Sequence, residues 1–137
     1  MNSKQIEINF SSNGTNELNG DRDKFFQMIL NLVENAIKYS NDKTLINIRT
    51  YDINDYTYIE VEDNGVGIPK EDLPRIFERF YRVDKSRAKG GTGLGLAIVK
   101  HIARMFNGEI FVKSTLNKGT KFTIKLRKNI KTDDFIY

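Results

Sequence analysis

Two glycine-rich runs lie in the second half of the 137-residue chain, one over residues 63–69 and the other over residues 90–97. Each run presents backbone N–H groups without bulky side chains, which suits the close approach of a phosphorylated ligand. Only the first run begins with an acidic residue, Asp63, and only the second leads directly into a helical pattern. Two such runs in so short a chain predict a nucleotide bound between them.

The second run differs from the common phosphate-binding loops. A Walker A loop has Lys and Ser or Thr after its last glycine, whereas Leu96 and Ala97 follow here. A dinucleotide-binding fingerprint needs a preceding strand and a glycine at its sixth position, and both are missing. The run is therefore predicted to form a glycine-rich helix N-terminus, which binds anions through unpaired N–H groups and the helix dipole.

Length and composition predict a single domain, with a core over about residues 6–126 and a C-terminal tail over 127–137. The chain has no cysteine, which excludes disulfides and thiolate metal sites. It has no apolar run long enough to span a membrane and no visible signal peptide. We therefore expect a soluble cytoplasmic domain.

The net charge of +4 is unevenly distributed along the chain. Five basic residues cluster just before the second glycine run: Arg79, Arg82, Lys85, Arg87 and Lys89. They form either a solvated loop or a loop that contacts phosphates. No motif that reads DNA or RNA accompanies them, so nucleic acid is not an expected partner.

Hydrophobic periodicity predicts the order of helices and strands. Alternating patterns predict strands over 6–10, 45–51, 58–62, 109–114 and 121–126. Helical spacing predicts helices over about 23–39 and 93–106, with one or two short helices over 69–82. This order favours an α+β fold, a two-layer α/β sandwich in which helices cover one face of a mixed, mostly antiparallel sheet.

Three polar residues of the first helix, Asn31, Asn35 and Lys38, are spaced to lie on one face. That face is expected roughly opposite an apolar stripe formed by Phe25, Ile29, Leu32, Val33 and Ala36, which Phe26 and Ile37 broaden. The polar face is either solvent-exposed or the wall of a binding site. In the second case the amide oxygen of Asn35 suits Mg²⁺, and Lys38 would face a phosphate.

The segment around Asp63 also has two interpretations. Asn64-Gly65 after a strand is a common turn signal. However, the glycine pattern continues through Gly67 and a helical segment follows instead of a partner strand. A carboxylate held at the strand end would accept the exocyclic N–H of adenine, and the glycines would let the base approach.

Five motifs in order resemble those of the catalytic, ATP-binding domain of bacterial sensor histidine kinases. They are 31–39 for the N box, 63–67 for the G1 box, 76–82 for the F box, 91–96 for the G2 box and 119–122 for the last glycine motif. The sequences of residues 80–85 and 97–101 resemble those of the phosphate-responsive and cell-wall-responsive kinases. The likeness covers nearly the whole chain.

This resemblance implies the Bergerat ATP-binding fold, which type II topoisomerases, Hsp90 chaperones and MutL share, with ATP and Mg²⁺ as ligands. Asn35 would be the Mg²⁺ ligand, and catalysis would depend on Asn35, Lys38 and Arg82. The implied nucleotide-binding residues are Asn31, Asn35, Lys38, Tyr39, Asp63, Gly65, Gly67, Ile68, Tyr81, Arg82, Gly91, Thr92, Gly93, Leu94, Gly95, Leu96 and Thr120. Phe77 and Phe80 either anchor a mobile lid over the phosphates or belong to the core.

The resemblance also implies a partner. The phosphoacceptor histidine of such kinases lies in a separate dimerisation domain, and nothing in this chain matches its context. The only histidine, His101, follows the G2 box and is expected to be an inert surface residue. We therefore expect a monomeric catalytic domain that does not autophosphorylate alone. Its parent would be membrane-anchored and would signal to a response regulator.

Rival functions remain open from the sequence. Related ATPases such as gyrase B and MutL carry a water-activating glutamate four residues before the Mg²⁺ asparagine, where this chain has Asn31. Glu34 is a weaker candidate base. An anti-sigma-factor serine kinase fits less well because of the Phe80-Tyr81-Arg82 stretch and the basic loop. A nucleotide-binding scaffold without transfer activity is the non-enzyme alternative.

Overall fold

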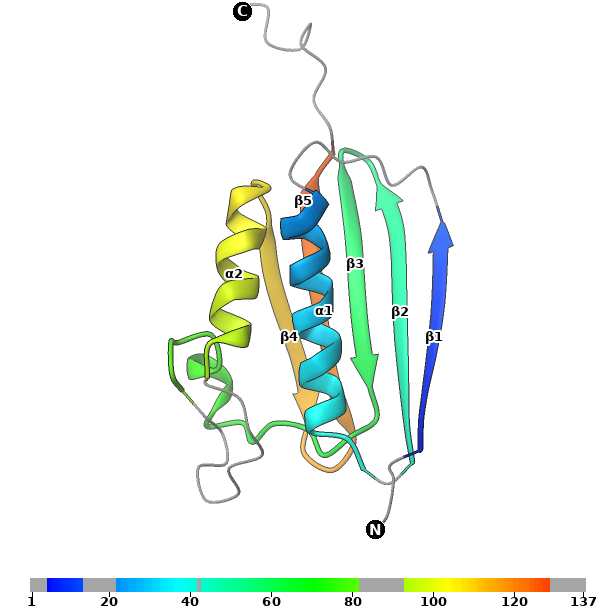
Figure 1. Ribbon diagram of the computed structural model, residues 1–137, viewed down its shortest axis with the longest axis vertical. Coiled ribbons are helices and arrows are strands. Elements are labelled where there is room, and N and C mark those ends of the chain that lie inside the picture. The colour runs from blue at the N-terminus through cyan, green and yellow to red at the C-terminus, as the bar shows by residue number, and fades with distance from the viewer. Residues whose placement is uncertain (1–4, 14–21, 42, 82–92, 129–137) are drawn as a thin grey trace, which may run out of the picture.

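The computed structural model describes residues 5–13, 22–41, 43–81 and 93–128. Two helices cover one face of a five-stranded sheet (Figure 1). The elements are β1 (Gln5–Asn13), α1 (Arg22–Lys38), β2 (Lys43–Ile53), β3 (Tyr56–Asp63), the 3₁₀ helix η1 (Leu73–Arg75), α2 (Gly95–Met105), β4 (Glu109–Thr115) and β5 (Gly119–Arg127). The predicted two-layer α+β class is confirmed, and the helical segment after Pro69 is a single short 3₁₀ turn.

The sheet has the strand order β1-β2-β3-β5-β4. β1 and β2 are parallel because α1 connects them as a crossover, whereas every other neighbouring pair is antiparallel. The register of the antiparallel strands pairs Asp63 with Thr120, and Thr120 with Ser114. These three residues therefore lie side by side at one end of the sheet, on the face that the helices cover.

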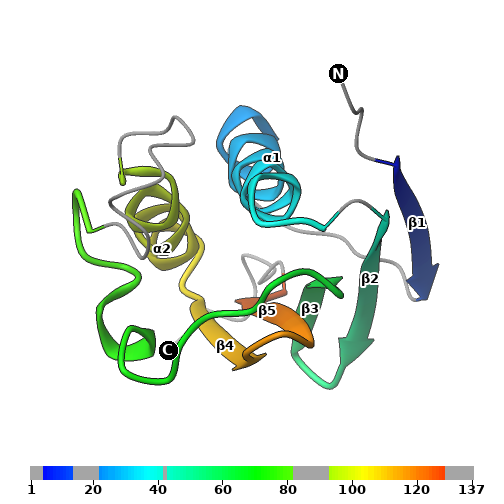
Figure 2. The same cartoon turned by 90° about the horizontal axis from the view of Figure 1, so that it is seen from below.

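The core lies between the sheet and the helices, as the view along the strands shows (Figure 2). Ile59, Val61, Phe122 and Ile124 project from the two central strands and are almost fully buried. The two helices contribute Met28, Leu32, Ala36, Val99, Ile102 and Ala103. Strict alternation along β3 and β5 thus gives one apolar face that α1 and α2 cover.

The buried stripe of α1 differs in two ways from the predicted one. Met28, which the prediction omitted, is fully buried, whereas Phe26, which it included, is 65% exposed. The core-facing residues Met28, Leu32 and Ala36 are each four positions apart, so the stripe is centred on them. The rest of the predicted stripe is confirmed, since Leu32 and Ala36 are buried and Phe25, Ile29, Val33 and Ile37 pack against the core.

The polar row of α1 was predicted to lie roughly opposite the apolar stripe, but it lies nearer to the core. Asn31, Asn35 and Lys38 are each half-buried and flank the core stripe, whereas Glu34 is exposed. α2 packs beside α1, and Asn31 contacts its first residue, Gly95. The row is therefore partly covered rather than fully solvated.

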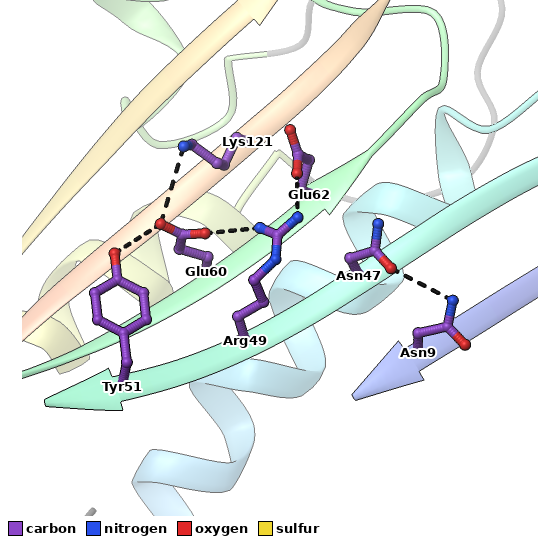
Figure 3. Close-up of polar contacts among 7 residues, drawn as sticks. All are labelled: Asn9, Asn47, Arg49, Tyr51, Glu60, Glu62 and Lys121. Carbon is purple, nitrogen blue, oxygen red and sulfur yellow. Dashed lines mark hydrogen bonds and ion pairs between the residues drawn. The ribbon is translucent and has the colours of Figure 1, made fainter. Parts of the chain in front are cut away.

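The opposite face of the sheet carries a charged network (Figure 3). Arg49 donates to Glu60 at 2.7 Å and to Glu62 at 2.8 Å, and the hydroxyl of Tyr51 donates to Glu60 at 2.7 Å. Lys121 lies 3.9 Å from the same Glu60 carboxylate. Complementary charges on neighbouring strands thus stabilise the face opposite α1 and α2.

Candidate nucleotide-binding site

The carboxylate of Asp63 lies at the end of β3, where the strand enters the first glycine run. Its side chain is buried, with the residue 8% exposed, and the N–H of Gly65 donates to Oδ1 at 2.8 Å. Burial raises the pKa of Asp63 above its usual 3.8, although hydrogen bonds from the backbone N–H groups of Gly65 and Thr120 oppose the shift. The site therefore holds an acceptor that is oriented by backbone groups and poorly solvated.

The turn after Asp63 is held from both sides by backbone groups. The N–H of Val66 donates to the carbonyl of Tyr39 at 3.1 Å, at the end of α1. The N–H of Asn117 donates to the carbonyl of Val66 at 2.7 Å, in the turn between β4 and β5. The first glycine run thus joins the end of α1 to the β4–β5 turn.

Gly67 shows why a glycine is needed in this turn. Its φ of 75° lies in the left-handed region, and a Cβ there would lie 2.3 Å from the carbonyl oxygen of Thr115. Any side chain would push the turn away from β4. The residue therefore allows the first glycine run to pack closely against the end of β4.

α1 brings the two glycine runs to one site. The side-chain amide of Asn31 donates to the carbonyl of Gly95 at 3.4 Å, which places the second run beside α1. Two turns further along the helix, Tyr39 accepts the hydrogen bond from Val66 of the first run. Asn35 is four residues after Asn31 and four before Tyr39, so it lies between the points at which the two glycine runs contact this segment.

The described part of the second run begins at Gly93 and leads into α2. Leu94 is the N-cap residue, and no side chain caps this helix end. A Cβ on Gly95 would meet nothing within 4 Å, so the first turn of α2 borders open space. Backbone N–H groups at such a helix end attract anions. Arg82, Gly91 and Thr92 were predicted here but lie outside the described residues.

The two aromatic residues of the F box have different surroundings. Phe77 packs edge-on against Phe122, with ring centroids 6.2 Å apart, so it belongs to the core. Phe80 is 67% exposed. Tyr81, predicted to bind nucleotide, donates its hydroxyl to Asp72, and the guanidinium of Arg75 lies 4.6 Å from its ring centroid. These contacts fix the chain just before residue 82.

Of the remaining predicted site residues, some lie near Asp63 and others belong to the hydrophobic core. Thr120 is buried beside Asp63, and Ile68 and Leu96 contribute to the hydrophobic core. Lys38 lies with its Nζ 5.4 Å from the Tyr39 ring centroid. His101 is exposed on α2, as predicted.

Sequence reasoning missed two side chains that hold the turn. Asn64 accepts the N–H of Leu45 through Oδ1 at 2.8 Å, which ties the turn to β2. Ser114 accepts the N–H of Ile68 at 2.8 Å. The alternation of β4 was a usable signal for Ser114, because it places this polar residue on the same face as Ile110 and Val112.

The donor set suits a cation that arrives with its own anionic ligands. Among the described residues, no three His, Cys, Asp or Glu side chains form a metal site. Mg²⁺ prefers oxygen ligands and retains water and phosphate oxygens in its shell. An amide oxygen such as that of Asn35 is a ligand of this oxygen type.

Comparison with known proteins identifies the family. Residues 20–130 match the model of the histidine kinase-, DNA gyrase B- and HSP90-like ATPases, and both glycine runs and α1 fall within this match. The chain belongs to this ATPase family. The predicted likeness to sensor histidine kinases is confirmed by relatives of that name within the family.

Two such relatives are bacterial sensor kinases. The chain is 44% identical over 111 residues to the sensor histidine kinase WalK of Bacillus subtilis, a match that covers 77% of this chain and 18% of WalK. It is 48% identical over 103 residues to the signal transduction histidine-protein kinase ArlS of Staphylococcus aureus, covering 74% of this chain and 23% of ArlS. The match thus spans about a fifth of the length of each of these relatives.

Solved structures agree with the family assignment. The mycobacterial sensor histidine kinase MprB superposes with a TM-score of 0.79 at 29% identity, covering 91% of this chain and 86% of that one. The nucleotide-free catalytic domain of histidine kinase ThkA has a TM-score of 0.77 at 30% identity, covering 90% and 80%. The fold is therefore that of histidine kinase catalytic domains, the Bergerat fold.

Proposed function

We propose that this chain binds Mg·ATP and transfers the γ-phosphoryl group to a histidine on a separate domain, as the catalytic domain of a sensor histidine kinase. One observation carries the proposal. α1 joins the Asp63 turn through Tyr39 and the N-terminus of α2 through Asn31. The proposed base-reading carboxylate and the proposed anion-binding helix end are therefore both tied to the segment of α1 that carries Asn31, Asn35 and Lys38, and this arrangement supports a nucleotide lying along it.

Each residue has a role in this proposal. Asp63 accepts the exocyclic N–H of adenine, and Asn35 holds Mg²⁺, which neutralises phosphate charge when bound. Lys38 and Arg82 are the proposed cations near the transferred group. The other proposed nucleotide contacts are Asn31, Tyr39, Gly65, Gly67, Ile68, Tyr81, Gly91, Thr92, Gly93, Leu94, Gly95, Leu96 and Thr120.

Phosphoryl transfer demands positioning and charge stabilisation from the protein more than covalent chemistry. An imidazole nitrogen of the separate domain forms a bond to the γ-phosphorus while the bond to the bridging oxygen breaks, and ADP leaves. The other ring nitrogen, which carries the proton of the neutral imidazole, then loses it to solvent. Asn31 is an amide and cannot activate water, and Glu34 points to the exposed side of α1, so hydrolysis by this chain is expected to be slow.

The partners follow from the same proposal. The short match to WalK and ArlS supports a longer parent that supplies the histidine-bearing dimerisation domain. A membrane-anchored parent would place this domain on the cytoplasmic side and pass phosphate to a response regulator. No helix among the described residues is long and apolar enough to cross a membrane.

The proposal is tested by mixing this chain with Mg²⁺, γ-labelled ATP and the dimerisation domain of its parent. Acid-labile, base-stable label on that domain is expected, because phosphohistidine has this stability. A second reaction with a parent domain whose phosphoacceptor histidine is replaced by Gln should remain unlabelled. Tight ATP binding without transfer would instead favour a nucleotide-binding scaffold.

A further inference from the structure

Ser114 connects the first glycine run to the strands that flank Asp63. Its Oγ accepts the N–H of Ile68 at 2.8 Å and donates to the carbonyl of Gly119 at 3.0 Å. It also lies 2.8 Å from Oγ1 of Thr120. One hydroxyl on β4 thus contacts the far end of the turn and the beginning of β5.

The hydrogen-bonding capacity of this hydroxyl is fully used. A serine hydroxyl has one proton to donate and two lone pairs that accept. If Ser114 donates to Gly119, it accepts from both Ile68 and Thr120, and all three contacts are satisfied at once. A group with every donor and acceptor paired in a half-buried place holds its partners in one arrangement.

The arrangement continues to the proposed base-reading carboxylate. Ser114 pairs with Thr120 across β4 and β5, and Thr120 pairs with Asp63 across β5 and β3. The backbone N–H of Thr120 is one of the two groups that hydrogen-bond the Asp63 carboxylate. Ile68 lies at the other end of the turn that begins at Asp63. Ser114 therefore contacts both the end of the turn that follows Asp63 and the strand that pairs with Asp63.

We propose that Ser114 is a positioning residue for recognition of the adenine base, an inference that rests on the proposed nucleotide-binding function. It acts through Ile68 and Thr120, and it keeps the Asp63 carboxylate aimed at the exocyclic amine. Loss of its hydroxyl leaves the N–H of Ile68 without its acceptor and loosens the turn. Discrimination between bases should then weaken more than attraction of the phosphates.

The test compares ATP with ITP, which carries a carbonyl oxygen in place of the exocyclic amine of adenine. In Ser114→Ala the Kd of ATP should rise roughly tenfold, the factor that about 1.4 kcal/mol corresponds to. The Kd of ITP should stay near its original value, so the ratio of the two constants falls. Ser114→Thr, which retains a hydroxyl, should restore the preference for ATP. Thr123→Ala removes a hydroxyl from the other face of β5 and should change neither constant.

The outcomes separate this inference from the proposed function. If Asp63→Asn weakens ATP binding while Ser114→Ala leaves the Kd of ATP and the Kd of ITP unchanged, the positioning role is wrong but the base-reading role of Asp63 is supported. If Asp63→Asn binds ATP as tightly as the original chain, the base-reading site itself is wrong. An equal rise in both constants for a folded Ser114→Ala protein shows a merely structural role. Should the alanine variant not fold, Ser114→Cys keeps the volume with weak hydrogen bonds, and an unchanged ratio in that variant overturns the inference.

Discussion

The backbone N–H of Phe80 donates a hydrogen bond of 2.8 Å to the carbonyl oxygen of Gly93. Both residues have left-handed backbone conformations, with φ of 65° at Phe80 and 79° at Gly93. A Cβ on Gly93 would lie 2.7 Å from both Cα and the carbonyl carbon of Phe80. The two chain segments that flank residues 82–92 are thus joined by direct backbone contact, which only glycine permits.

Gly93→Ala should therefore lower the free energy of unfolding by about 1–3 kcal/mol, because it combines backbone strain with a steric clash. Thermal or urea denaturation of the 137-residue chain measures the effect. Gly95→Ala is the matched control, since a Cβ there meets nothing within 4 Å and the residue lies in α2. That control should match or exceed the original stability by up to about 1 kcal/mol. Equal losses in both variants would contradict the proposed contact.

The pH dependence of ATP binding should report the ionisation of Asp63. Its pKa is raised by burial, so protonation begins at a higher pH than for an exposed Asp with a pKa of 3.8. The protonated form no longer offers a free acceptor to the adenine amine, so affinity should fall as the pH drops through the raised pKa. Isothermal titration calorimetry at successive pH values measures this. Asp63→Asn should bind weakly with a flatter profile, and an equally steep profile would assign the titration to another group.

The same pKa has the opposite consequence for folding. Because the folded state favours protonated Asp63, this residue contributes stability below pH 3.8 and loses it as the pH rises through its raised pKa. At neutral pH the buried carboxylate therefore costs stability in the nucleotide-free protein. A bound adenine amine would offset part of that cost, which is a reason to expect a rise in melting temperature with ATP.

Steady ATP hydrolysis by the isolated chain should be slow and should not depend on Asn31 as a base. Asn31→Ala removes an amide that contacts Gly95, so it is expected to weaken ATP binding modestly. At saturating ATP, the rate of phosphate release should remain within about twofold, since no general base is lost. A coupled ADP-release assay measures it, with Glu34→Gln as the control. A large fall in kcat for Asn31→Ala alone would favour the water-activating ATPases.

The sequence predicted what depends on local spacing. Alternation located the five strands among the described residues, and helical spacing placed Asn31, Asn35 and Lys38 on one side of α1. It chose Phe26 over Met28 wrongly, because both are apolar and only packing against the sheet decides which is buried. Likewise, Phe77 and Phe80 are three residues apart in an irregular segment, and only contact with Phe122 makes one of them core.

The sequence indicated which residues belong to the candidate site, but not the hydrogen bonds that hold the turn beside Asp63. The glycines beside Asp63 were predicted to let a base approach, and this stays a prediction; at Gly67 the structure shows close packing against the backbone of Thr115. Ser114 was not predicted, because its partners Ile68 and Thr120 come from separate segments. The contact with Ile68 joins residues 46 positions apart, which no local pattern specifies, although the alternation of β4 indicated that Ser114 lies on the core face.

The network on the open face of the sheet gives a stability prediction that is independent of nucleotide. Tyr51 stacks on Tyr58 with ring centroids 5.2 Å apart, but only the Tyr51 hydroxyl bonds to Glu60. Burial and the hydrogen bond to Glu60 raise the pKa of Tyr51 from 10.0 to about 12. Tyr51→Phe should lower the free energy of unfolding by about 1 kcal/mol at neutral pH, because Glu60 loses one donor. Tyr58→Phe keeps the stacked pair and should change the free energy of unfolding by less than about 0.5 kcal/mol.

The pH dependence of this pair of variants follows from two opposite shifts. Tyr51 contributes stability below pH 10.0, and the contribution is lost as the pH rises through about 12. Burial raises the pKa of Glu60, but hydrogen bonds from Tyr51 and Arg49 outweigh it and the net pKa is below 4.5. Glu60 thus contributes stability above pH 4.5 that is lost as the pH falls through its lowered pKa. The deficit of Tyr51→Phe should therefore be largest between these limits and shrink in acid and in alkali, and a deficit constant over the whole range would show that the lost hydroxyl acts through packing alone.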